Sequence, residues 1–101
     1  MKCIEAIIGD IMEEVEGAEH YAKLALRYKD SDRDLAEMYH SMSKQEAMHA
    51  ENLYAQGHRI MCRIKEQDPE DYKKMLWAWE WEHEKTLEEL AEARVLQDMF
   101  R

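Results

Sequence analysis

The sequence is poor in the residues that interrupt helices. Its 101 residues include only 3 glycines and 1 proline. Residues of high helix propensity, chiefly Glu, Ala, Lys, Leu and Met, dominate instead. This scarcity of helix breakers predicts an all-α fold and excludes one based on sheets. A chain of this length makes a single domain, residues 1–101, around a modest core.

Positive charge and long hydrophobic runs are also scarce. Lys and Arg number 14 against 23 Asp and Glu, which gives a formal net charge of -9. Because phosphate binding needs a basic face, we expect neither nucleic acid nor an anionic membrane as a partner, whereas cations would be attracted. The N-terminal apolar patch is too short and too acidic for a signal peptide or a membrane span. We therefore expect a cytoplasmic protein.

Cysteine is equally sparse, since the chain has only Cys3 and Cys62. They form no close pair, which excludes a Cys-x-x-Cys redox motif and a zinc knuckle built from paired thiolates. Two free thiols in a reducing compartment are the simplest interpretation.

Two breaks divide the chain into three predicted helices. In the first break, Ser31 or Asp30 is placed to cap the following helix. In the second, Asp68 is a favoured N-cap and Pro69 a favoured first helical residue. The predicted helices cover residues 2–28, 32–65 and 69–99.

Each predicted helix has an apolar stripe at helical spacing, expected to face the core. In the second helix this stripe includes an acid and a histidine, Glu46 and His49. The stripes are Ile4, Ile7, Ile8, Ile11, Val15, Ala18, Ala22 and Ala25; then Leu35, Met38, Met42, Glu46, His49, Leu53, Gln56 and Ile60; then Tyr72, Met75, Leu76, Trp79, His83, Leu87 and Leu90.

One further acid, Glu14, falls within the stripe of the first helix. Burying an unpaired carboxylate costs several kcal/mol by order of magnitude, so Glu14 needs a metal, a cation or a hydrogen-bonding Tyr as its partner. The alternative is a position at the helix edge, from which the carboxylate reaches water.

Glu-x-x-His spacing occurs three times in the chain, but with 16 Glu and 5 His it is expected to recur by chance. Position on the helix therefore decides which of the three pairs is a candidate metal ligand pair. Glu37 and His40 fall off the stripe and are expected to face water. Glu46 and His49 fall on it, side by side, as two ligands of one ion would. A hydrogen-bonded core histidine is the alternative for His49.

Glu80 and His83 form the third pair, on the predicted third helix. They offer two more ligands from the same chain, or a polar contact at a helix interface. Trp77, Trp79 and Trp81 spread around more than one side of this helix, which favours burial of two faces, as at an oligomer interface.

Two segments together resemble a known superfamily. The run Glu-Val-Glu-Gly-Ala-Glu-His-Tyr at 14–21, followed by Glu46-Ala-Met-His49-Ala, resembles the ferritin-like di-iron carboxylate proteins, in particular rubrerythrin-like and encapsulated-ferritin-like members. In that family one helix places a Glu seven residues before a Tyr, and the next carries Glu-x-x-His-Ala. The similarity covers roughly residues 10–56.

The resemblance implies a role for each matching residue. Glu14 would be a terminal or bridging carboxylate, Glu46 a bridging carboxylate and His49 the imidazole ligand, with Tyr21 as a hydrogen-bond partner behind them. It implies two Fe(II) ions per site, oxidised by oxygen or peroxide in a ferroxidase or peroxidase type of reaction. Mixed Glu and His ligands suit iron, manganese or zinc, and an excess of carboxylates favours iron or manganese.

The chain departs from the family in having too few helices. Complete sites use four bundle helices, and only three are predicted here. We therefore expect a two-fold homodimer in which the first two helices of each chain form a ferritin-like four-helix bundle, with Glu14, Glu46 and His49 from both copies around two metals. Encapsulated ferritins are similar in building their site between protomers. A site within one chain that adds Glu80 and His83 is the alternative.

A different class of function is also compatible with the sequence. Met and Trp, at 8 and 3 residues, suit interfaces, although Met stripes are more often plain core. A non-enzymatic acidic helical scaffold or partner-binding protein is the interpretation that this composition favours.

Overall fold

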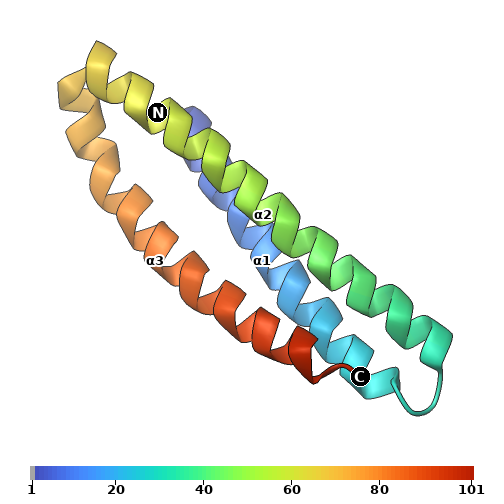
Figure 1. Cartoon of the computed structure of the whole chain (residues 1–101). Coiled ribbons are helices and arrows are strands. Elements are labelled where there is room, and N and C mark those ends of the chain that lie inside the picture. The colour runs from blue at the N-terminus through green and yellow to red at the C-terminus, as the bar shows by residue number, and fades with distance from the viewer. Residues whose placement is uncertain (1) are drawn as a thin grey trace.

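The computed structural model describes residues 2–101, without the Lys2 side chain. It contains α1 (Lys2–Tyr28), α2 (Arg33–Gln67) and α3 (Pro69–Met99), and no strand occurs in this part of the chain. The predicted all-α class is confirmed, and each predicted helix end lies within two residues of the observed one. The three helices run up and down along a rod of 55 × 17 × 16 Å, and the C-terminus lies beside the α1–α2 connection (Figure 1).

The helix starts follow from side-chain caps. Asp68 accepts a hydrogen bond from Asp71 N–H at 3.1 Å, and Pro69 follows it as predicted. At α2 the cap is Asp32, which accepts from Leu35 N–H at 3.2 Å, so the prediction of Ser31 or Asp30 was wrong. The reason is local: the N–H groups of residues 31 and 32 still bond to the last carbonyl of α1, and the chain is free to start a new helix only afterwards.

Small side chains form the contact between α1 and α2. Ala18 and Ala22 on α1, and Ala36 and Ala50 on α2, are at most 1% exposed. Alanines at a helix contact let the two backbones approach closely, and this close packing fixes which residues of the two helices face each other.

A buried polar link joins all three helices. The Ser43 hydroxyl on α2 donates to the Ala18 carbonyl on α1 at 2.6 Å, and the Gln97 amide on α3 donates to the Ser43 hydroxyl at 2.9 Å. Ser43 and Gln97 are both buried. Because each polar atom in this chain of bonds has a partner, the link sets the register of the helices without a desolvation penalty.

The predicted α2 stripe was wrong by part of a turn. Of its eight members only Ile60 is buried; Met38 is 47% exposed, and the side chain of His49 is 51% exposed. The prediction followed the large apolar side chains, whereas every buried residue of α2 before Ile60 is Ala, Ser or Gly. The buried residues of α2 are Ala36, Ser43, Ala47, Ala50, Gly57, Ile60, Met61 and Ile64.

Two smaller expectations about orientation were also wrong. His40, expected to face water, is half-buried and stacks on Phe100 with ring centroids 4.4 Å apart, because the chain end folds back over α2. Leu87, expected in the core, is exposed. No helix in residues 2–101 has the length and apolar character needed to cross a membrane.

Candidate metal centre

Three of the predicted ligands come together where α1 and α2 cross. Glu14 on α1 and Glu46 and His49 on α2 each place one ligand atom within 4.8 Å of the others. His49 Nδ1 lies 3.5 Å from Glu14 Oε2 and 3.8 Å from Glu46 Oε1. Ligands bound at about 2.0–2.2 Å to one ion are separated by about 3–4 Å, so these distances fit a shared cation. Within residues 2–101 this is the one Glu/His/Asp/Cys group of such density.

The local fold explains why these side chains meet. Glu46 and His49 are three residues apart, so they project side by side from α2. Ala18 of α1 and Ala47 of α2 are buried in the same core cluster, which keeps the helices close at this level. Glu14, one turn before Ala18, therefore faces the pair.

Gly17 gives the Glu46 carboxylate its place against α1. A Cβ atom at position 17 would lie 2.9 Å from Glu46 Oε2 and 3.5 Å from its Cδ and Cγ. The carboxylate therefore lies over the bare backbone of α1. Gly17 was not predicted to have a role, although a glycine three positions after Glu14, in a helix otherwise lined by alanines, is a sequence signal for a close approach.

Glu14 makes ionisation of the Glu46 carboxyl group more costly. A hydrogen bond with Glu14 raises the pKa of Glu46 most, burial and the charge of Glu14 raise it further, and His49 opposes them. Glu14 Oε2 is itself buried and accepts no hydrogen bond from the described residues. Two adjacent carboxyl groups, one of them with an unsatisfied oxygen, form a site whose charge a cation can balance.

The site lies at the surface and is open on one side. Glu14 and His49 line a hollow of about 330 Å³ together with Asn52, Leu53 and Gln56. The side chains of Glu14 and Glu46 are about a quarter exposed and that of His49 about half. Three ligands from one side leave the remaining coordination positions of an ion facing outward.

The other predicted site residues lie elsewhere. Tyr21 stacks on Tyr39, with centroids 5.9 Å apart, and no hydrogen bond from it to the three ligands occurs in residues 2–101. His83 stacks on Tyr54 at 4.1 Å and, with the exposed Glu80, lines a separate groove between α2 and α3. The structure thus groups three of the five predicted ligands.

Comparison with known proteins adds no assignment: the chain matches no protein-family model, and neither curated proteins nor solved structures include a significant match. The evidence for metal binding is therefore the arrangement of Glu14, Glu46 and His49.

Proposed function

We propose that this protein binds iron at Glu14, Glu46 and His49 and oxidises Fe(II) with oxygen or peroxide. The observation that supports metal binding is the convergence of two carboxylates and one imidazole within 4.8 Å. A ligand set richer in carboxylate than in imidazole favours iron or manganese over softer ions. The resemblance of residues 10–56 to ferritin-like di-iron proteins supports the choice of reaction.

A two-fold dimer would complete this site. Two residues of α2 contact α3, namely Glu51 and Tyr54, and His40 stacks on Phe100 just after α3. These three lie between about 140° and 180° around α2 from His49, so α3 covers the other side of the helix. The face around the site keeps Tyr21, Leu24, Met42 and Leu53 only half-buried. We call these four residues the open face.

Packing two open faces about a two-fold axis would produce a four-helix bundle from the α1–α2 pairs. The two sets of Glu14, Glu46 and His49 would then supply four carboxylates and two imidazoles to two ions. Four carboxylate charges balance those of two Fe(II) ions, which removes the main cost of gathering the acids in a bundle core.

The chain's own residues would provide position and charge. Glu46, set against Gly17, would bind the ion as a carboxylate, and the positive charge of the ion would oppose the effect of Glu14 that raises its pKa. Bound iron would supply the electrons that reduce oxygen or peroxide. The acidic surface would raise the local concentration of cations near the site.

Anaerobic titration with Fe(II), followed by oxygen, tests the proposal. We expect one Fe(II) per chain and a ferric absorption change on oxygenation. The double variant Glu46→Ala, His49→Ala should bind no iron, while Glu13→Ala, which removes an exposed acid next to Glu14, should bind it normally. The absence of both stoichiometric binding and an absorption change in the unaltered protein would refute the proposal.

A second candidate, a non-enzymatic helical scaffold, is favoured by the outer face of α3. Trp77 is 74% exposed and Trp81 57%, and the two rings stack on each other at 6.1 Å between centroids. Exposed tryptophans are enriched at protein interfaces. Oligomers that bind no iron and depend on Trp77 and Trp81 would support this candidate.

A further inference from the structure

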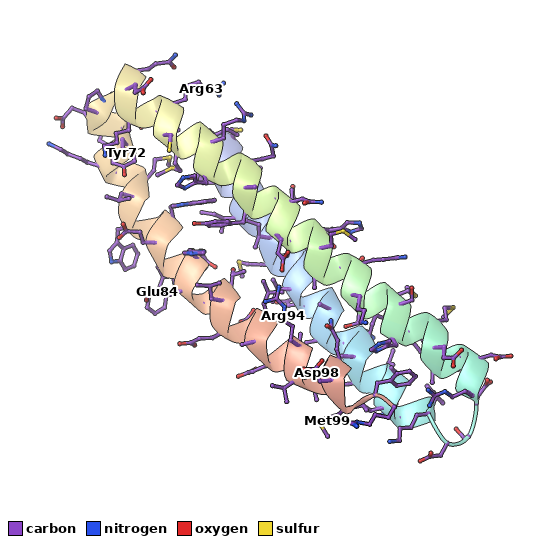
Figure 2. All side chains as sticks on the ribbon, in the orientation of Figure 1. Arg63, Tyr72, Glu84, Arg94, Asp98 and Met99 are labelled. Carbon is purple, nitrogen blue, oxygen red and sulfur yellow. The ribbon has the colours of Figure 1, made fainter. Side chains whose placement is uncertain are left out.

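A second cluster of metal-ligating side chains lies away from the Glu14 site, in a groove of about 370 Å³ between α2 and α3. The groove lies towards the α2–α3 connection, where Tyr72 forms part of its wall (Figure 2). His58 and Cys62 line it from α2, and Glu80 and His83 line it from α3. None of these residues belongs to the Glu14, Glu46 and His49 group.

The α2 pair has the spacing of two ligands on one ion. His58 and Cys62 are one helical turn apart, and the His58 Nε2 atom lies 3.7 Å from Cys62 Sγ. A tetrahedral ion with a metal–sulfur distance of about 2.3 Å and a metal–nitrogen distance of about 2.0 Å separates its ligands by about 3.5 Å. The pair therefore needs almost no rearrangement to bind a metal.

The surroundings of the pair favour a bound ion as well. Cys62 is a free, exposed thiol, so it is available for binding. The His58 ring lies stacked beside Tyr54 at 6.2 Å between centroids, which limits its rotation. His83 lies on the opposite wall, where its imidazole adds a second nitrogen ligand to the groove.

We propose that His58 and Cys62 form a binding site for a zinc-class divalent cation, with its open positions facing Glu80 and His83 across the groove. On binding, the Cys62 thiol loses its proton to solvent as the metal–sulfur bond forms, and neutral His58 donates the Nε2 lone pair while Nδ1 keeps its hydrogen. Thiolate and imidazole together select zinc over iron or manganese. The chain would thus hold two sites of different ligand chemistry.

Titration of the full-length, reduced protein with Co(II) tests this second site. Cobalt substitutes for zinc and gives a thiolate-to-metal charge-transfer band in the near ultraviolet, which a site made of carboxylates and imidazole cannot produce. We expect this band at one cobalt per chain and its loss when zinc is added. Cys62→Ser should abolish the band, and His58→Ala should weaken cobalt binding by at least about tenfold.

The matched control is Cys3→Ser, because Cys3 is also a free, exposed thiol but has no imidazole beside it. This variant should keep the band. The variant Glu46→Ala, His49→Ala should also keep the charge-transfer band. The experiment can therefore refute the iron site and the His58–Cys62 site independently. Both Cys62 and His58 are exposed, and circular dichroism will confirm that their variants fold. Cobalt binding without the band, or a band that survives Cys62→Ser, would overturn the proposal.

Discussion

At the scale of single residues, Glu46 is the most constrained member of the candidate iron site. Its carboxyl group lies between the Glu14 carboxyl, His49 Nδ1 and the backbone at Gly17. Changing the charge of this carboxyl group, or the space that it occupies, should therefore change stability or iron binding measurably.

The raised pKa of Glu46 predicts how stability depends on pH. Folding favours the protonated acid, so its stabilising contribution is complete below the ordinary value of 4.5 and is lost as the pH rises through the raised folded pKa. In urea denaturation of metal-free protein, the free energy of unfolding should fall across that window. Glu46→Gln should flatten the fall. A slope of the same sign should remain, since burial also raises the pKa of Glu89.

A pH profile that is identical in the Glu46→Gln variant and the unaltered protein would contradict this reading. Glu70→Gln is the matched control, because Glu70 is an exposed acid at the start of α3. It should not flatten the fall, because it removes no buried carboxyl group.

Gly17→Ala should weaken iron binding without lowering the stability of the metal-free protein. Alanine gains about 0.8–1 kcal/mol over glycine in a helix interior. Its Cβ would displace the Glu46 carboxylate, however, which lies 2.9 Å from that point. We expect thermal stability of the metal-free protein to rise or hold while iron affinity falls by about tenfold or more.

Gly9→Ala is the control for Gly17→Ala. It adds the same helix propensity without displacing a side chain, because nothing lies within 4 Å of a Cβ at position 9. The Gly9→Ala variant should be more stable than the unaltered protein and should bind iron with unchanged affinity. Iron affinities that are equal in the Gly17→Ala variant and the unaltered protein would show that Gly17 does not position Glu46.

At the scale of helices, α3 packs on α2 through a close approach at Gly57. A Cβ there would lie 2.2 Å from Cη2 of Trp79, a buried indole that also stacks on Tyr54 at 5.3 Å. Elsewhere Arg94 of α3 pairs with Glu51 of α2, an exposed contact of small energetic weight.

Gly57→Ala should therefore destabilise the protein by about 1–3 kcal/mol, despite the higher helix propensity of alanine. Chemical denaturation and tryptophan fluorescence would measure the loss and the shift of Trp79. A variant as stable as Gly9→Ala would contradict the packing seen here.

Helix bounds and register were not equally predictable from sequence. The bounds follow from local signals, such as the Asp68–Pro69 start of α3, and lie within two residues of the observed helix ends. The register of α2 was predicted wrongly, because the contact with α1 depends on how closely small residues such as Ala47 and Ala50 let the backbones approach. Hydrophobic periodicity gives large side chains more weight than alanine, so it placed Glu46 and His49 on the buried face.

The meeting of Glu14 with Glu46 and His49 was nevertheless expected from their positions on adjacent helices, and the structure brings them together. That they bind metal stays a prediction. Gly17 and the His58–Cys62 pair were missed, since their significance depends on distances between side chains that the sequence does not contain.

At the scale of the whole molecule, the protein is a three-helix rod with an acidic net charge of -9 and a candidate metal site at its surface. Three ligands at a surface bind an ion less tightly than the same ligands enclosed. The open face around Met42 and Leu53 is apolar, and its burial against a second copy would enclose the site and double its ligands.

Charge on the open face should therefore prevent dimer formation. Met42→Glu and Leu53→Glu place new acids in the expected interface, next to the existing carboxylates, and should give monomers by analytical ultracentrifugation. Val95→Glu, on the outer face of α3, is the control and should leave the dimer intact. A dimer that persists in both open-face variants would place the interface elsewhere.

Native mass spectrometry of the iron-loaded protein is the most direct test of a dimeric iron site, because it reports the copies of the chain and the metal ions in one particle. We predict a dimer that carries two iron ions, and an iron-free protein when Glu46 and His49 are both replaced by Ala. A particle of any size that holds no iron after anaerobic loading, or one whose iron content is unaffected by these two substitutions, would contradict the account.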